Sequence, residues 1–147
     1  MDIAWFPKRY VVNSNMVELA KTLPLFRNLR FDGGVEVYGI RPHYFLLTDG
    51  HCDWHDDKHH DSKWIAILIV RNDSNSWVET LSLKSRNKQL GRIVLFDCYK
   101  RHRLNQEGGE KNGKSGVWAA LECSFDKKPT KIEVEKCFAD KSYLIRS

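Results

Sequence analysis

Short runs of apolar residues, separated by polar turns, follow one another over most of the chain. The clearest is WIAILIV at residues 64–70, which has the length of a buried strand and is far shorter than the roughly 20 apolar residues of a membrane helix. The intervening sequences, such as TDG and RNDSNS, are rich in turn-forming residues. This pattern predicts an antiparallel β sandwich or barrel. We predict seven strands, at residues 35–40, 43–48, 63–70, 76–83, 92–97, 117–125 and 131–136.

The segment before Gly33 and Gly34 does not show the short apolar runs of the rest of the chain. Apolar residues recur at helical spacing from Met16 to Leu23. Asn15 and Glu18 have the spacing of a capping box, and Pro24 ends the pattern. The sequence therefore predicts one or two N-terminal helices.

A chain of 147 residues is long enough to form one domain with its own hydrophobic core. We expect a single domain, residues 1–147, that is mainly β. It would consist of an N-terminal helical segment at residues 1–34 and a β-barrel core at residues 35–147. The first ten residues, MDIAWFPKRY, lack the apolar core of a secretory signal, so we expect a cytoplasmic protein that does not enter a membrane. The four cysteines form no CxxC pair, and we expect them to be reduced thiols.

The net charge of +5 is unevenly distributed. Residues 1–73 carry a net charge of −1 and residues 74–147 one of +6. A basic half suits a polyanion or an anionic small substrate, and it suits equally a solvated lysine-rich surface. One stretch is rich in basic residues, namely Lys84, Arg86, Lys88 and Arg92. These side chains could bind phosphates, or they could protect an edge strand from pairing with other chains.

The stretch HCDWHDDKHH, residues 51–60, contains two H-x-D patterns, His51 with Asp53 and His55 with Asp57. In an extended segment, residues two apart face the same side, so either pair could bind one ion. Imidazole nitrogen and carboxylate oxygen without thiolate suit Fe(II), Mn or Zn. A third ligand must come from elsewhere, and His102 follows the strand-like sequence GRIVLFD. A polar hairpin tip is the simplest alternative reading of this stretch.

Together, WHDD, WIAILIV and GRIVLFDCYKRH resemble the Fe(II)/2-oxoglutarate-dependent dioxygenase superfamily. Members carry an H-x-D…H iron motif on a double-stranded β-helix, the jelly-roll barrel. The resemblance covers about residues 35–125 and implies an oxygenase that uses Fe(II), 2-oxoglutarate and O2. It implies that the metal ligands and catalytic residues are His55, Asp57 and His102, with His51 and Asp53 as the second choice for the first pair.

The resemblance also implies a cation for the far carboxylate of 2-oxoglutarate. Family members usually place an arginine, sometimes a lysine, on the strand after the second histidine, but VWAALECSF contains neither. We assign this role to Lys114, which precedes the strand. Tyr38 and Tyr44 precede the motif, where family members often place a hydroxyl donor to the cosubstrate. The prime substrate is unidentified; the basic half favours a nucleic acid or an acidic protein.

Two alternatives to an oxygenase remain. YFLLTDG resembles the family's strand that ends in H-T-D-G, but Leu47 stands where the histidine belongs. In that register the chain would be a non-catalytic barrel that acts as a binding or inhibitory interaction protein. The other alternative is a cupin-like metal-binding protein, although the chain has no H-x-H motif.

Overall fold

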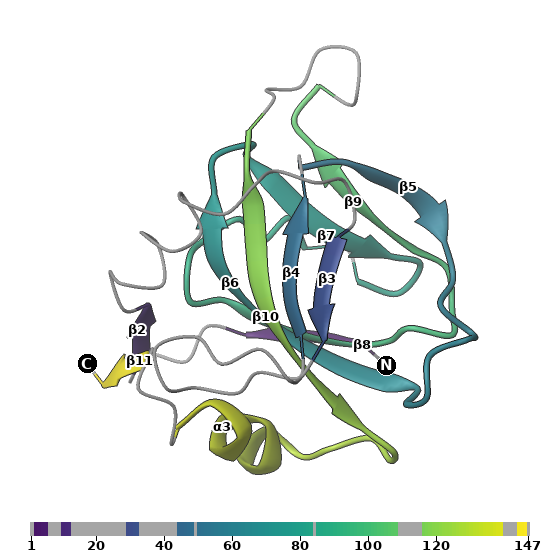
Figure 1. Ribbon diagram of the computed structural model, residues 1–147, viewed down its shortest axis with the longest axis vertical. Helices are drawn as coiled ribbons and strands as arrows, with labels where there is room; N and C mark the ends of the chain where they lie inside the picture. The colour runs from purple at the N-terminus through teal and green to yellow at the C-terminus, as the bar shows by residue number, and fades with distance from the viewer. Residues whose placement is uncertain are drawn as a thin grey trace.

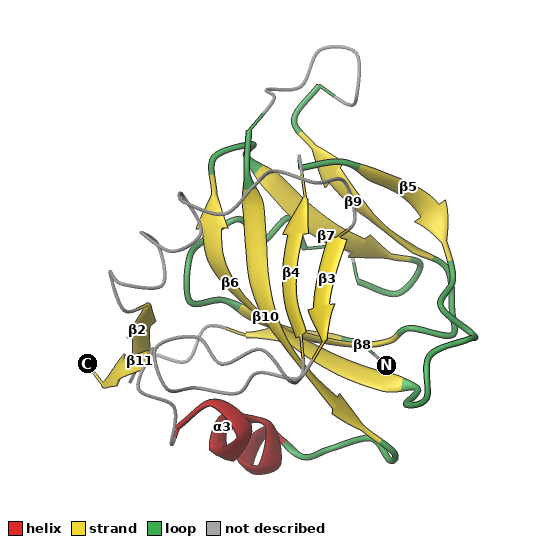
Figure 2. Ribbon diagram, viewed as in Figure 1, coloured by secondary structure: helices red, strands yellow, loops and turns green. Residues whose placement is uncertain are grey.

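The computed structural model describes most of the chain in several stretches and has a mainly β architecture (Figure 1). The described residues are 2–5, 10–12, 29–32, 44–48, 50–83, 85–108, 116–139 and 144–146. Within these residues the single helix is α3 (Lys131–Ala139), drawn in red at the lower edge of Figure 2.

The larger sheet has six antiparallel strands. Its centre is formed by the apolar runs that the sequence predicted as strands. In spatial order it consists of β1 (Ile3–Trp5), β8 (Ile93–Asp97), β6 (Trp64–Asn72), β10 (Trp118–Phe125), β4 (Tyr44–Thr48) and β3 (Leu29–Asp32).

A second, three-stranded antiparallel sheet lies against the first (Figure 1). It consists of β5 (Cys52–His55), β9 (His102–Gln106) and β7 (Ser76–Thr80). A separate two-stranded pair joins β2 (Tyr10–Val12) to β11 (Leu144–Arg146).

Consecutive strands alternate between the two larger sheets. From β4 to β10, each even-numbered strand belongs to the six-stranded sheet and each odd-numbered strand to the three-stranded sheet. From β4 to β10, consecutive strands are therefore not neighbours in a sheet, and β10 lies between β4 and β6. The end of β5 and the start of β9 line one cavity together with residues of the larger sheet.

The turn from β4 to β5 depends on glycine. Gly50 has a φ of 92°, a left-handed conformation that side chains disfavour. A Cβ atom at this position would also collide with Ser74. The Gly50 carbonyl accepts a hydrogen bond of 2.7 Å from Ser76 Oγ, which fixes the turn against the start of β7.

The two sheets share one hydrophobic core. Strand β6 is buried on both faces, as expected for a central strand. One of its faces contacts side chains of the smaller sheet, including Val78 and Leu104. The hydrophobic core therefore lies between the two sheets. Polar side chains of the smaller sheet that point toward this core are buried as well.

The last predicted strand, residues 131–136, is wrong because this segment is the start of α3. The sequence KIEVEK alternates like a strand, but Thr130 and Glu133 form a capping box. Thr130 Oγ1 accepts from the Glu133 N–H, and Glu133 Oε1 accepts from the Thr130 N–H, both at 3.2 Å. These reciprocal bonds start a helix where the alternation suggested a sheet.

The N-terminal predictions are only partly described. Residues 35–40 and the predicted helix at 16–23 lie outside the described residues. Within the predicted helical segment, β1 and β3 belong to the six-stranded sheet, where they pair with β8 and β4. The sheet therefore begins before residue 35.

Candidate metal centre

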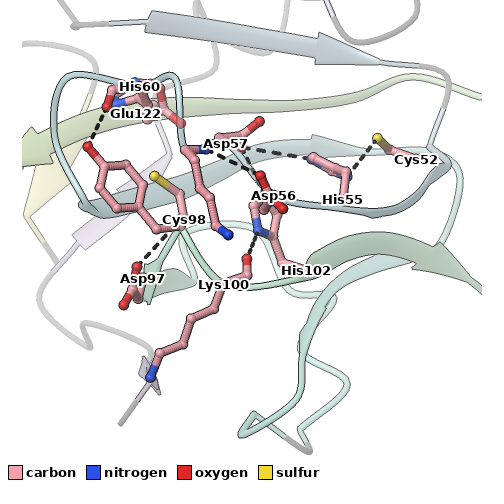
Figure 3. Close-up of polar contacts among 12 residues, drawn as sticks. Cys52, His55, Asp56, Asp57, His60, Asp97, Cys98, Lys100, His102 and Glu122 are labelled. Carbon is pink, nitrogen blue, oxygen red and sulfur yellow. Dashed lines mark hydrogen bonds and ion pairs between the residues drawn. The ribbon is translucent and has the colours of Figure 1, made fainter.

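Three of the predicted ligands converge at one end of the smaller sheet (Figure 3). One ligand atom from each of His55, Asp57 and His102 lies within 4.8 Å of the other two. The Asp57 carboxylate is central, with Oδ2 at 3.0 Å from His102 Nε2 and 3.8 Å from His55 Nε2. Asp57 and His102 are buried, and His55 is half-buried.

Strand pairing accounts for the approach of the two histidines. His55 ends β5, His102 begins β9, and the register pairs them directly. Their rings meet edge to face with centroids 4.3 Å apart. Two residues after His55 the chain leaves the sheet, and the Asp57 N–H donates to the Cys98 carbonyl at 2.8 Å. The pairing and this bond bring residues that are distant in sequence to one point.

Each histidine is oriented by a backbone carbonyl. His55 Nδ1 lies 2.6 Å from the Asp53 carbonyl oxygen, and His102 Nδ1 lies 2.8 Å from that of Lys100. A carbonyl oxygen only accepts, so both Nδ1 atoms carry the proton. In the neutral rings the lone pair is then at Nε2, the atom that faces Asp57. Such carbonyl contacts are the usual support of metal-binding histidines.

Two imidazole lone pairs and a carboxylate pointing at one another repel unless a cation lies between them. A proton on Nε2 or a metal ion meets this need. Two histidines and one carboxylate with open positions are the donor set typical of non-haem Fe(II). The residues present therefore fit a divalent metal ion, and the donor chemistry fits Fe(II).

The Cys52 thiol lies next to His55 and raises the pKa of its imidazole. Cys52 Sγ lies 3.5 Å from His55 Nδ1, and its hydrogen bond is the largest cause that raises the pKa of His55. Burial lowers this pKa and the Asp53 carbonyl raises it, and the net pKa lies above the ordinary value of 6.5. Protons therefore compete with a metal ion at His55 up to a higher pH than at an ordinary histidine.

The loop that carries Asp57 is tied to the turn between β8 and β9. The Cys98 N–H donates to the Lys63 carbonyl at 2.8 Å, and Tyr99 Oη donates to the His60 carbonyl at 2.6 Å. The His60 N–H donates back to the Asp57 carbonyl at 2.8 Å. These bonds fix the carboxylate ligand although it lies outside the strands.

The three ligands line a cavity of about 620 Å³ between the sheets. Apolar side chains from both sheets form much of its wall, so the cavity is suited to hold a ligand away from water. These apolar residues are Ile65, Ile67, Val78, Phe96, Leu104 and Trp118.

The other residues of the histidine-rich stretch are placed differently. His51 and Asp53, the alternative pair, are not part of the three-residue group found among the described residues. Asp56 and His59 are exposed. His60 is buried, with 8% of its surface exposed, and its Nε2 lies 3.9 Å from Glu122 Oε2.

The structure gives little information on the three residues that were predicted to bind 2-oxoglutarate. Lys114 and Tyr38 lie outside the described residues. Tyr44 begins β4, where the register pairs it with Glu122 of β10. Their assignment to 2-oxoglutarate stays a prediction.

Two cavity residues were missed by sequence reasoning. Arg103 lies over the Trp54 ring at 4.7 Å and pairs with Glu79 at 3.0 Å. Glu122 is 0% exposed and stands among apolar neighbours on β10. A charged residue inside the apolar run WAALECSF was the available signal for Glu122, because buried charges are rare unless paired or functional.

The expectation for the cysteines is also corrected. Cys52 and Cys98 are reduced thiols, as predicted, but Cys123 on β10 is disulfide-bonded. Among the described residues, no helix has the length and apolar character needed to cross a membrane.

Comparison with protein-family models, with curated proteins and with solved structures gave no match for this chain. The functional argument therefore rests on the geometry of the site.

Proposed function

We propose that this chain is an Fe(II)/2-oxoglutarate-dependent dioxygenase. The observation that carries the proposal is the convergence of His55, Asp57 and His102 on the wall of an apolar cavity. Both histidines present Nε2 to the same carboxylate because backbone carbonyls hold their Nδ1 atoms. A carboxylate with two oriented imidazoles leaves one side of a bound metal ion open to other ligands.

The topology supports a double-stranded β-helix as the frame. Alternation of seven consecutive strands between two antiparallel sheets is the connectivity expected of a jelly roll. In this frame the ligands would come from the end of one strand, the loop after it and the start of another strand. His55, Asp57 and His102 occupy these places.

Each part of the proposed site has a distinct task. His55, Asp57 and His102 would hold Fe(II), which together with 2-oxoglutarate supplies the activation of O2 for substrate oxidation. The apolar wall would exclude water from the reacting groups. The Cys98 and Tyr99 contacts would keep Asp57 in place through the reaction. Lys114 would neutralise the far carboxylate of 2-oxoglutarate, and Tyr38 and Tyr44 would donate hydroxyl hydrogen bonds to it.

The sequence predicted a cytoplasmic location, whereas the bond at Cys123 favours an oxidising compartment. Disulfides are rare in the cytosol, where glutathione and thioredoxin keep thiols reduced.

The reaction on the prime substrate would be a hydroxylation or a demethylation. The basic half of the chain favours a nucleic acid or an acidic protein as this substrate.

The first experiment measures succinate formation from 2-oxoglutarate by protein loaded anaerobically with Fe(II) and then given O2. We expect slow turnover without a prime substrate, and loss of this turnover in His102→Ala. His59→Ala is the matched control, because His59 is an exposed histidine at the same cavity. Absence of both turnover and iron-dependent binding of 2-oxoglutarate in the wild-type protein would reject the proposal.

A further inference from the structure

The cavity continues beyond the candidate metal centre along the strands of the smaller sheet. His55 and His102 form one row of paired residues, and Phe96 lies beside them, with ring centroids of Phe96 and His102 4.9 Å apart. Two residues further along β9, Leu104 pairs with Val78 of β7, and both of these side chains line the cavity. The candidate metal centre is therefore followed by a wall of hydrocarbon side chains.

The larger sheet supplies the opposite wall, which is also mainly hydrocarbon. Ile65 and Ile67 point to the same face of β6 because they are two residues apart, and both line the cavity. Trp118 of β10 lines it as well and is 1% exposed. Its indole Nε1 has no accessible surface, so this side chain also presents carbon atoms to the cavity.

The carboxylate and guanidinium groups of the described lining are placed away from this interior. Both carboxylate oxygens of Glu122 lack accessible surface, and Asp57 would hold the metal ion. Asp53 is exposed, and the Arg103 side chain, which pairs with Glu79, is 27% exposed, so both belong to the part of the lining that faces water. A ligand that enters between the described walls therefore meets mainly carbon.

We propose that the cavity binds a small molecule whose buried part is an uncharged hydrocarbon chain. The chain packs on apolar residues of both sheets, such as Ile67 and Val78, and its part beside Phe96 lies nearest the candidate metal centre. The volume of about 620 Å³ is within the usual range of small-molecule sites, and burial of apolar surface drives binding.

This inference names the prime substrate class of the oxygenase, and in that respect it rests on the proposed function. Binding of the hydrocarbon chain itself requires neither Fe(II) nor 2-oxoglutarate. The ligand class and the oxygenase can therefore be tested, and can fail, separately.

The net charge of +5 favours anionic partners for the surface of the protein, and the interior of the cavity has a different preference. A charged group that left water for this hydrocarbon wall would lose its hydration without compensation. Any charged part of the substrate would therefore stay at the water-exposed residues Asp53 and Arg103, while the hydrocarbon part is buried.

The test measures binding by isothermal titration to the full-length protein without added metal. The first probes are butan-1-ol, hexan-1-ol and octan-1-ol, and we expect affinity to rise about fourfold for each added methylene group. Hexane-1,6-diol has a hydroxyl group at whichever end enters, and it should bind about tenfold more weakly than hexan-1-ol. Affinity that is independent of chain length, equal binding of the diol or no binding of any alcohol would overturn the proposal.

Two variants locate the binding site. Val78→Thr keeps the shape of a wall residue and adds a hydroxyl group that the bound chain would desolvate, so hexan-1-ol should bind at least about fivefold more weakly. Val94→Thr makes the same change at a core residue, 1% exposed, that is not part of the described lining, and it should leave the affinity unchanged. With folding checked by circular dichroism, wild-type affinity in Val78→Thr would contradict the proposed wall.

A protein side chain is a second possible source of a hydrocarbon group, and N-acetyl-leucinamide imitates it. Hexan-1-ol should bind more tightly than this compound, and the reverse order would overturn the assignment to a small molecule.

Succinate formation separates the two proposals. Normal succinate formation without binding of any alcohol would overturn the ligand class and leave the oxygenase in place. Chain-length-dependent binding of alcohols, without succinate formation or iron-dependent binding of 2-oxoglutarate, would overturn the oxygenase and support the hydrocarbon site.

Discussion

The two large sheets face the same cavity but differ in what their residues contribute. The six-stranded sheet is mainly apolar at its centre, and its central strand β6 is buried on both faces. The three-stranded sheet has one buried and one partly exposed face, as the alternating burial along β9 shows. His55 and His102 belong to this smaller sheet, and Asp57 follows directly after its first strand.

This difference indicates a division of roles. Burial of branched apolar side chains supplies most of the stability, and the larger sheet has most of them. The smaller sheet can bury histidine and aspartate because the larger sheet forms the rest of the core around them. Substitutions in the two sheets should therefore have separable effects on stability and on metal binding.

The largest expected effect comes from the larger sheet. Leu68 of β6 is 0% exposed, and Leu68→Ala should lower the free energy of unfolding by about 2–5 kcal/mol, since it leaves a cavity. Urea unfolding measures the change. The control is Leu81→Ala, whose side chain is 66% exposed and whose loss should cost less than about 0.5 kcal/mol. Similar losses for both leucines would contradict the assignment of the core.

A smaller effect on stability, but a clear one on metal binding, is expected at the turn that holds Asp57. Tyr99→Phe removes the hydrogen bond to the His60 carbonyl and should cost about 0.5–1.5 kcal/mol. It should also weaken Co(II) binding, measured by absorbance, by about tenfold because Asp57 is less well positioned.

Thr130→Ala is the matched control for this variant. It removes the cap of α3 and should cost a comparable amount of stability, about 0.5–2 kcal/mol. Because α3 contributes none of the three ligands, Co(II) affinity should be unchanged. If both variants weaken Co(II) binding alike, Tyr99 acts only through general stability.

The smallest effect is expected on the outer face of the smaller sheet. Burial raises the pKa of Glu79, but hydrogen bonds from Arg103, Asn105 and Trp77 outweigh it and bring the pKa below the ordinary value of 4.5. The lowered pKa stabilises the folded state above about pH 4.5, and this contribution is lost as the pH falls through the folded-state pKa.

Glu79→Gln should therefore reduce the loss of stability on acidification, by less than about 1 kcal/mol because the group is partly exposed. Urea unfolding at about pH 5.5 and pH 3 compares the two proteins. Asp61→Asn, which alters an exposed carboxylate, should leave the difference unchanged. A wild-type pH dependence retained in Glu79→Gln would show that other carboxylates govern acid stability.

The same difference between the sheets explains which strands were predictable. The apolar runs of β6, β8 and β10 were predicted because most of the residue types in them favour burial. β5 and β9 were not predicted. In β9 the inward positions are His102, Leu104 and Gln106, so two of three buried residues are polar and the hydrophobic alternation is invisible.

The candidate site was predictable in part for a related reason. Short motifs pointed to His55, Asp57 and His102, which the structure brings together. The approach of His60 to Glu122 depends on which loop covers which strand, and the spacing of residues along the chain does not record that. α3 was missed because alternation was given more weight than the capping box that begins at Thr130.

The alternation of strands between the sheets also governs how the chain must fold. β4 pairs with β10, and β5 pairs with β9, so most strands have to wait for a partner much later in the sequence. Chains dominated by such non-local pairing fold slowly, over milliseconds to seconds, because loop closure costs entropy before contacts form. On the ribosome, β4 has no partner in β10 until nearly the whole chain has emerged. The three candidate metal ligands would thus meet only late in folding, so a bound metal ion would stabilise the finished fold without guiding its formation.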